Sequence, residues 1–383
     1  MSLNILDMHM GLKKITNMSV NRKNICLLHL SPIFFVAALL LLGVNLVLYS
    51  VFGYDVKLML RGVSSGFLCL FFILKKEMKL NLKFILLLSA SCLMLLFSQF
   101  AAINAAWLCF FIFCCQNESY DKVLCVFCKV SCFITVSILI LFLLGKIDIQ
   151  SVVIGDRIRG VIGKQNPNSL SLLLFSLLSP FLLKNDTLIT KMLGMLLLYA
   201  VYLFTNSRTV FMGYCIYLIA GAFFATLQKS KVIIFTLLVL FLTLIFLCPL
   251  YIPYLMENYS VFDEILSFRL SIFSEYINTQ SIKNYILGGS LPTDTSLDNA
   301  YVLTLFSTGI LFYVLWYLLS IYSSMVLYVN ARYNELSFVI ATTSMGLFES
   351  YLVRPEFYLS LLYWLILFSP YKLISEKQRK YRY

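Results

Sequence analysis

Charged residues are scarce in this chain of 383 residues, and histidine is almost absent. Asp, Glu, Lys and Arg make up 13% of the sequence, against about 25% in an average soluble domain, whereas apolar residues make up 61%. This composition excludes an ordinary cytosolic enzyme, a disordered chain and a disulfide-linked scaffold. The only histidines, His9 and His29, lie near the N-terminus. The sequence has no HExxH motif, no phosphate-binding glycine loop and no nucleophilic triad.

Cysteine is missing from the two long polar segments of the chain, residues 146–168 and 251–298. All eleven cysteines lie in or beside apolar runs, so disulfides do not hold these segments together. Cys125, Cys128 and Cys132 share one helix face, but no histidine accompanies them, and packing is their expected role. We expect neither a metal nor a cofactor.

Apolar segments, many close to the length of about 20 residues that spans a membrane, alternate with short polar breaks. The sequence therefore predicts an all-α integral membrane protein with about 12 transmembrane helices and one large outer loop containing an amphipathic helix. Residues 1–250 would hold nine helices and the outer loop 146–168, residues 251–298 the large outer loop, and residues 299–383 three helices and a basic tail. The expected spans are 31–50, 58–74, 84–98, 101–115, 123–145, 169–183, 192–206, 209–227, 232–250, 299–320, 336–353 and 357–371.

The positive-inside rule sets the orientation. With the N-terminus in the cytoplasm, 20 of the 30 Lys and Arg residues fall on the cytoplasmic side, and both termini are cytoplasmic. A net charge of +12 is common among nucleic-acid-binding proteins, but here the cations interrupt apolar runs instead of lining one polar face. The bilayer is therefore the expected partner, and nucleic acid is not.

Arginine departs from this orientation. Lysine divides 16 to 4 in favour of the cytoplasm, whereas arginine divides 4 to 6. A guanidinium group is always charged and holds phosphate or carboxylate with two parallel hydrogen bonds. The set predicts a phosphate-bearing or acidic ligand at the outer interface; alternatively each arginine pairs with a nearby acid. The outer arginines are Arg61, Arg157, Arg159, Arg208, Arg269 and Arg354.

Two polar breaks carry candidate anion-binding residues. In the loop 146–168, glycines are expected to give flexibility, and Arg157 and Arg159 point the same way if the chain is extended. Asn168 would cap the helix that follows. The sequence leaves two roles open for this segment, which are contact with an anion and a solvated loop. Arg208 lies in a tight break between two apolar spans with no adjacent acid, where a charge needs a partner or a function unless it only reaches toward water.

The large loop 251–298 contains an amphipathic pattern over residues 260–277. Arg269 falls on the apolar stripe of this pattern and would face a buried anion, or else pair with Glu275 or Asp263. The loop closes with Asp298 and Asn299, and Tyr301 follows. Asp298 can cap the next helix, or act as a base or an acceptor for a sugar hydroxyl.

The junction of the last two spans holds Glu349, Arg354 and Glu356. An acid within about one helical turn of the outer face, as Glu349 is, should line a polar cavity or pair with an arginine.

These motifs together resemble the O-antigen polymerases of bacterial envelope polysaccharide synthesis, within the superfamily that also contains O-antigen ligases. The similarity covers roughly residues 150–320 by motif and the whole chain by topology. The motifs are Arg159-Gly160 with Asn166-Pro167-Asn168, then Ser207-Arg208, then Arg269 with Ile286-Leu287-Gly288-Gly289, and last Asp298-Asn299-Ala300-Tyr301 with Gly309-Ile310.

The resemblance implies a multi-pass glycosyltransferase of the bacterial inner membrane that uses neither metal nor nucleotide sugar. Its donor and acceptor would be glycans on undecaprenyl pyrophosphate, and a chain-length regulator protein would be a possible partner. Arg208 and Arg269 would bind the pyrophosphate, with Arg157, Arg159 and Arg354 as secondary candidates. Asp298 would be the base with Glu349 in reserve, and Asn168, Asn299 and Tyr301 would contact the glycan.

Two alternatives stay open. An O-antigen ligase typically carries histidine where this chain has Asp298. A flippase or transporter of lipid-linked oligosaccharide would suit many spans, but it should show repeated halves and broken helices at the midplane. The sequence shows no internal repeat, and its polar residues gather at the outer boundary.

Overall fold

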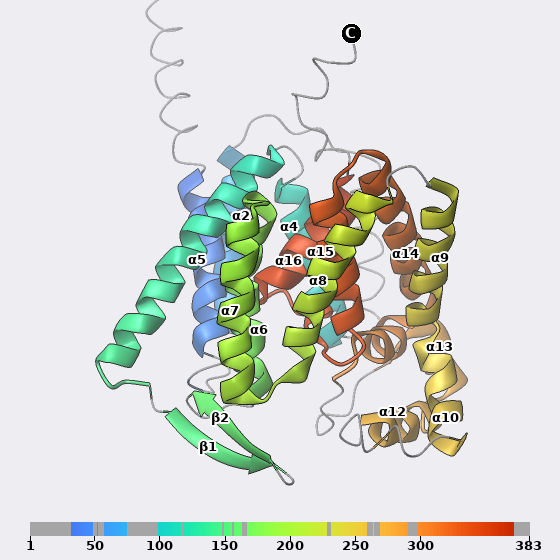
Figure 1. The fold of residues 1–383 in the computed structure, drawn as a ribbon. Coiled ribbons are helices and arrows are strands. Elements are labelled where there is room, and N and C mark those ends of the chain that lie inside the picture. Colours follow the sequence, from blue (N-terminus) through green and yellow to red (C-terminus); the bar gives the residue numbers. More distant parts are fainter. Residues whose placement is uncertain are drawn as a thin grey trace, which may run out of the picture.

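The protein is mostly helical (Figure 1). The computed structural model describes residues 32–48, 52, 57–74, 99–115, 118–147, 149–154, 157–162, 167–227, 231–258, 263, 269–289 and 298–370. Four helices among them are long and apolar enough to cross a membrane: α5 (Tyr120–Leu143), α7 (Leu188–Thr205), α8 (Arg208–Thr226) and α14 (Ala300–Val329).

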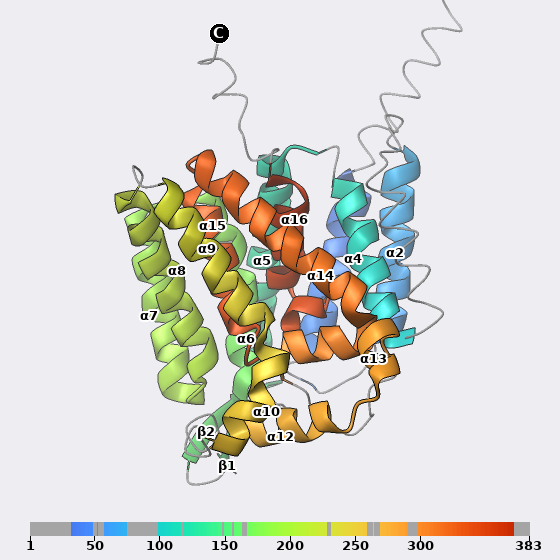
Figure 2. The same cartoon turned by 90° about the vertical axis from the view of Figure 1, so that its right-hand side faces the viewer.

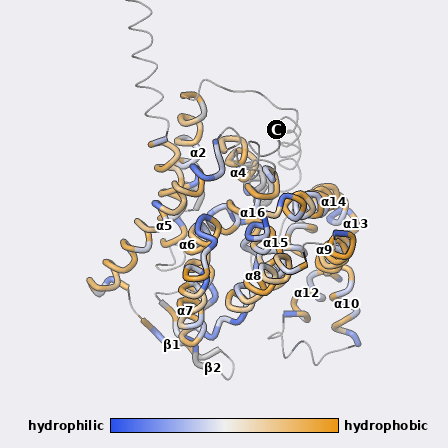
Figure 3. The backbone as a smooth tube through the Cα atoms, turned by 45° about the horizontal axis from the view of Figure 1, so that its top comes forward, coloured by the Kyte–Doolittle hydropathy of each residue, from blue (hydrophilic) through white to orange (hydrophobic). Residues whose placement is uncertain are grey.

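A fifth candidate span is bent. Helix α9 (Lys231–Phe246) and helix α10 (Cys248–Asn258) meet the length and hydropathy criteria together, but turn by 67° at their junction. Figure 3 shows how hydrophobic residues dominate α5, α9 and α14. The structure thus supports a membrane-embedded helical protein with four or five candidate spans in the described residues, and it does not show the twelve that the sequence predicts.

The remaining helices are shorter or less apolar. The expected span 84–98 and both chain ends lie outside the described residues. The expected loop 251–298 contains two short helices besides α10, and its segments 259–262, 264–268 and 290–297 also lie outside the described residues. The helices are Pro32–Val47, α2 (Lys57–Leu74), α4 (Gln99–Cys115), α6 (Pro167–Lys184), α12 (Arg269–Asn278), α13 (Ile282–Leu287), α15 (Tyr333–Met345) and α16 (Tyr358–Phe368).

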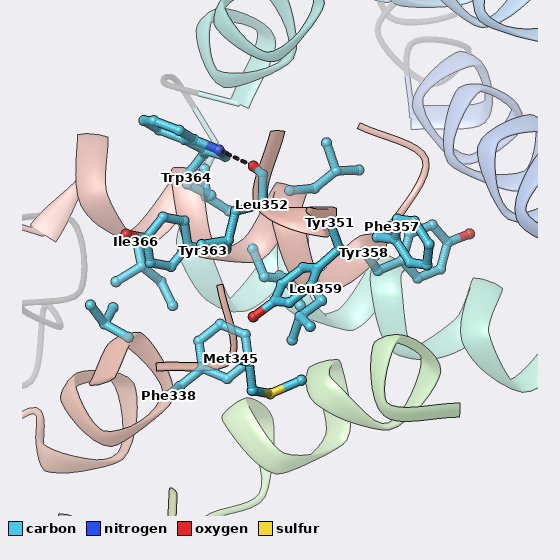
Figure 4. Close-up of a cluster of buried hydrophobic side chains, with 14 of the residues drawn as sticks. Phe338, Met345, Tyr351, Leu352, Phe357, Tyr358, Leu359, Tyr363, Trp364 and Ile366 are labelled. Atoms are coloured by element: carbon cyan, nitrogen blue, oxygen red, sulfur yellow. Dashed lines mark hydrogen bonds between the residues drawn. The ribbon is translucent and has the colours of Figure 1, made fainter. Parts of the chain in front are cut away.

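The last two expected spans, 336–353 and 357–371, contain helices that are shorter than expected. Helix α15 has 13 residues and α16 has 11, well short of the ~20 that a span needs. Both are buried, with α16 packed among α4, α6, α14 and α15. Figure 4 shows the core around them, where aromatic rings of α16 and of the segment before it lie together. Their apolar residues therefore lie in the centre of the bundle, and the structure does not count either helix among the four or five candidate spans.

The expected flexible loop 146–168 contains a β-hairpin, which the sequence analysis did not predict. Strand β1 (Ile149–Ile154) pairs antiparallel with β2 (Arg157–Ile162). A Cβ atom on Gly160 would lie 2.4 Å from the Phe204 ring on α7. Gly160 is therefore needed for close packing of β2 on α7, a role that the sequence pattern did not reveal.

The hairpin marks one end of the bundle. Figures 1 and 2 both place β1, β2, α10, α12 and α13 at this end. The short α7–α8 turn lies there too, because α7 runs toward β2 and packs on it. We call this the hairpin end. The α6–α7 turn, with Lys184 and Lys191, lies at the opposite end (Figure 1).

Helix α14 is broken at Gly309, whose φ of 80° and ψ of 169° are not helical. The C-terminal end of α13 fits into the break: the Gly289 N–H donates to the Phe306 carbonyl at 2.8 Å. Gly288, with φ of 78°, lies against the same break, and Cβ atoms on Gly288 and Gly309 would each approach backbone carbonyl oxygen to 2.5 Å. The Gly288-Gly289 and Gly309 motifs thus serve one backbone contact.

Replacing Gly309 by alanine is expected to destabilise the protein strongly. A side chain in this backbone region costs roughly 1–3 kcal/mol, and the Cβ would also collide with the Ile286 carbonyl oxygen. Gly66→Ala in α2 is the matched control, since a Cβ there meets nothing within 4 Å. Thermal unfolding in detergent should show a large drop for Gly309→Ala only; equal melting temperatures would contradict this account of the break.

Candidate functional site

A charged cluster at the hairpin end joins residues far apart in the sequence. Arg269 opens α12, Asp298 precedes α14, and Glu349 follows α15. Arg269 Nη2 lies 3.8 Å from Glu349 Oε1 and 4.0 Å from Asp298 Oδ2, while Nη1 donates to the Phe348 carbonyl. The guanidinium group therefore faces two carboxylates and a backbone oxygen, in a partly buried position.

The sequence predicted a buried anion beside Arg269 but suggested other partners. Asp263, one of the two acids considered, accepts a hydrogen bond from the Ser271 N–H at 3.1 Å. Glu275 is exposed on the outside of α12. The partners of Arg269 come instead from segments 29 and 80 residues further along the chain, a long-range contact that helical spacing cannot reveal.

Asn168 belongs to the same cluster. Its Nδ2 donates to Glu349 Oε1 at 3.2 Å, and the side chain is buried. Asn168 is the second residue of α6, which begins at Pro167, so it is not the helix cap that the sequence suggested. Its amide fixes the buried oxygen that Arg269 also faces.

Arg208 begins α8 directly after a turn that is hydrogen-bonded to α6, the helix that carries Asn168. One turn beyond Asn168, Ser171 Oγ lies 3.1 Å from Thr205 Oγ1, which also accepts the Ser207 N–H at 3.2 Å. Arg208 follows directly as the first residue of α8. It is exposed and makes no hydrogen bond or ion pair within the part of the chain that the structure describes. It is therefore available to bind an anion at the hairpin end.

Arg157 and Arg159 are brought to the same end by β2. Arg159 lies opposite Val152 in the hairpin and is half-buried, and Arg157 is the first residue of the strand. The neighbouring Gly160 packs on Phe204, two residues before the α7–α8 turn. Both residues belong to the extended strand that pairs with β1.

Asn299 and Tyr301 have structural contacts that correct their expected role in glycan binding. The Asn299 side chain accepts the N–H groups of Tyr301 and Val302 at 2.9 and 3.0 Å, so Asn299 caps α14 and Asp298 does not. The Tyr301 side chain is fully buried, stacks on Trp316 and donates to the Thr343 carbonyl at 2.7 Å. Neither side chain is presented to a ligand, and Asp298 is left available for other contacts.

Burial raises the pKa of both carboxyl groups in the cluster, which lie in segments between helices. The pKa of Glu349 rises to about 8 because the group is desolvated; Arg269 and Arg354 oppose the rise and Asp298 adds to it. Burial also raises the pKa of the more exposed Asp298, against the attraction of Arg269 and Arg354. Near neutral pH the pair therefore holds a proton that it can release or accept. Arg354 acts on the cluster through its positive charge, which opposes the rise in the pKa of both carboxyl groups.

The raised pKa of Glu349 predicts a pH-dependent stability. Between the unfolded pKa near 4.5 and the folded value of about 8, the folded state binds more protons than the unfolded state, so the free energy of unfolding falls as pH rises. Glu349→Gln removes this titration and should flatten the decline. Melting temperatures of both proteins in detergent across this range test it; parallel curves would contradict the assignment of the proton to Glu349.

The sequence analysis named both residues of a second buried ion pair but did not predict that they contact each other. Arg61 on α2 contacts Glu356 through Nη2 and Oε2 at 2.5 Å, and its Nη1 donates to Asn104 Oδ1 on α4 at 2.6 Å. All three side chains are buried. The available signal was an arginine inside an apolar run, which needs a partner because an unpaired charge is costly there.

No metal centre is found within the described ranges, where no three His, Cys, Asp or Glu side chains are grouped to hold an ion. Comparison of the chain with protein-family models, with curated proteins and with solved structures finds no match.

Proposed function

We propose that this protein is an O-antigen polymerase, a glycosyltransferase that joins lipid-pyrophosphate-linked repeat units at the outer face of the bacterial inner membrane. The proposal rests on the resemblance of its motifs and on one structural observation. Arg269, Asp298, Glu349 and Asn168, each selected from the sequence, are joined by contacts of 4.0 Å or less at the end of the bundle where α8 also begins with the exposed Arg208.

The chemistry requires a proton acceptor and a stabilised leaving group. A sugar hydroxyl of the acceptor attacks the anomeric carbon of the donor, the bond to the pyrophosphate oxygen breaks, and the hydroxyl proton passes to a carboxylate. Asp298 is the more exposed of the two acids, with 32% of its side chain accessible against 5% for Glu349. Asp298 is therefore the proposed base. Glu349, which is more deeply buried, influences the charge state of Asp298.

The arginines are assigned different roles in binding the leaving group and positioning the acids. Arg208 is exposed with no partner in the described structure, so it is the proposed ligand of the departing pyrophosphate. Arg269 is occupied by Asp298, Glu349 and Phe348, and it positions the two acids as well as adding positive charge. Arg157, Arg159 and Arg354 are proposed as secondary contacts for the anion or glycan.

The transporter alternative has one observation in its favour. Broken helices are a feature of transporters, and α14 is broken at Gly309. This break is filled by the backbone of Gly288 and Gly289, however, and the Phe306 carbonyl is already bonded there. A filled break offers no free backbone groups for a ligand at that contact.

The glycan banding pattern of a deletion strain separates the candidates. A polymerase predicts surface glycan that carries single repeat units only. Complete loss of surface glycan with lipid-linked polymer accumulating would indicate a ligase instead. Single lipid-linked units trapped on the inner leaflet would indicate a flippase, and normal ladders would contradict all three.

A further inference from the structure

The segment 346–357 links two buried charged clusters, one around Arg269 and one around Arg61. Glu349 lies near its start and meets Arg269, and Glu356 lies near its end and meets Arg61. The two glutamates are separated by a short 3₁₀ turn, Tyr351–Val353. One buried connection between α15 and α16 therefore carries an acid to each cluster.

The first half of this segment is held by the residues of the candidate site. The carbonyl of Gly346 accepts from the Ala300 N–H at 2.8 Å, that of Leu347 accepts from Asn299 Nδ2 at 2.9 Å, and that of Phe348 accepts from Arg269. Three successive carbonyls are thus bonded to α14 and α12, which places Glu349 beside Asp298.

The middle of the segment is fixed to the buried core. The Leu352 carbonyl accepts from Trp364 Nε1 at 2.7 Å (Figure 4) and from Ser360 Oγ at 2.8 Å. The Tyr351 hydroxyl donates to the Thr342 carbonyl at 2.6 Å. These contacts reach only α15 and α16, so they do not join the segment to the N-terminal helices.

The Arg61–Glu356 pair adds a charged contact with those helices, beside the packing of the 3₁₀ turn on α4 and the hydrogen bond that the Tyr358 hydroxyl donates to the Leu39 carbonyl at 2.8 Å. Arg61 bonds Glu356 and Asn104 together, so α2, α4 and the segment meet at one guanidinium group. Its Nε is buried and has no hydrogen-bond partner among the described residues, so within them the group depends on these two contacts. Removing one partner of such a pair leaves an uncompensated buried charge.

We propose that Arg61 and Glu356 are positioning residues that hold the segment 346–357 in place and thereby keep Glu349 at Arg269 and Asp298. Neither residue needs to touch a substrate for this role. The inference rests on the proposed function only for its catalytic consequence, because the position of the segment can be measured without activity.

Thiol labelling of Ser350→Cys tests the position directly. Ser350 follows Glu349 and is 4% exposed, so a cysteine there should be protected in a background whose native cysteines are replaced. Arg61→Gln or the isosteric Glu356→Gln should raise its labelling rate by about tenfold or more, because the segment loses its anchor. Arg61→Lys, which keeps the charge but loses the fork, should give an intermediate rate.

Arg332→Gln is the matched control. Arg332 pairs with Glu335 where α15 begins, in an ion pair away from the segment whose acid is buried and whose arginine is more exposed than Arg61, at 26% against 5%. Unchanged labelling in both Arg61→Gln and Glu356→Gln would overturn the proposal, as would an equal rise in Arg332→Gln. If only one of the two glutamine variants reaches the membrane, that variant decides.

Activity gives a second readout that a purely structural role would not move. If Arg61 acts through Glu349, then Arg61→Gln should lower polymer formation in the wild-type background but add no further loss to Glu349→Gln. Additive losses would contradict positioning. If the wild-type protein makes no polymer, the proposed function fails, and the labelling result still decides the positioning inference.

Discussion

Arg208→Ala is expected to abolish long-chain polysaccharide while the protein remains inserted at normal levels. Arg208 is exposed and has no partner among the described residues, so its removal breaks no contact there that stabilises the fold. Losing one preorganised donor to a developing negative charge typically costs about 10²–10³ in rate. The glycan ladder of cells carrying the variant, compared with its amount in membranes, provides the measurement.

Lys283→Ala is the control for this variant. Lys283 is an exposed cation on α13, also at the hairpin end, and its removal changes the net charge by the same amount. Normal ladders are expected from it. Normal ladders from Arg208→Ala would remove this residue from the site, and loss in both variants would point to a general effect of surface charge.

Arg269→Lys should also lose most activity, for a different reason. The Arg269 guanidinium uses two nitrogens to meet Glu349, Asp298 and the Phe348 carbonyl at once. A lysine ammonium is a single point charge on a flexible stem and cannot reproduce this fork. We expect a loss comparable to that of alanine, together with a changed pH profile, because Arg269 and Arg354 both oppose the rise in the pKa of Glu349.

The pH profile makes this prediction specific. With Arg269 displaced, the charges that face Glu349 are Asp298 and Arg354, so its pKa rises further and the active, deprotonated form of the pair needs a higher pH. The measurement is polymer formation in membranes across pH. A Lys variant with full activity and an unshifted profile would mean that any cation suffices at this position.

The sequence predicted the positions of helices and of residues in the breaks between them well where a single local signal was enough. The helices α5 to α9 lie close to the expected segments because each is a continuous apolar run between polar breaks. Arg208 could be selected because it lies in a short break without an acid. The prediction that Arg269 faces a buried anion followed from its place on the apolar stripe of α12.

Contacts between distant segments could not be predicted in the same way. An apolar run has the same pattern whether lipid or protein surrounds it, so the sequence did not show that α15 and α16 are buried among other helices. Tyr301 follows a polar motif, but only packing shows that its ring lies against Trp316. The pairing of Arg61 with Glu356 joins residues 295 positions apart, and no spacing rule connects them.

The hairpin illustrates the same limit at short range. Glycines in 146–168 suggested flexibility, whereas Gly160 is required by the Phe204 ring and Gly145 has φ of 63° at the end of α5. Gly160 therefore meets a steric demand and Gly145 a backbone conformation, whereas Gly155 and Gly163 lie outside the described residues. A sequence alone does not distinguish that demand from freedom of the chain.

The side of the membrane on which the hairpin end lies tests the central claim most directly, since only a site at the outer face can act on repeat units already moved across the bilayer. Single cysteines replace Lys283 at the hairpin end and Asp186 in the α6–α7 turn at the opposite end, in a background without native cysteines. A membrane-impermeant maleimide added to intact spheroplasts should label position 283 at once and position 186 only after permeabilisation. Labelling of position 186 alone in intact spheroplasts would place the arginines and carboxylates on the cytoplasmic side and contradict the proposed function.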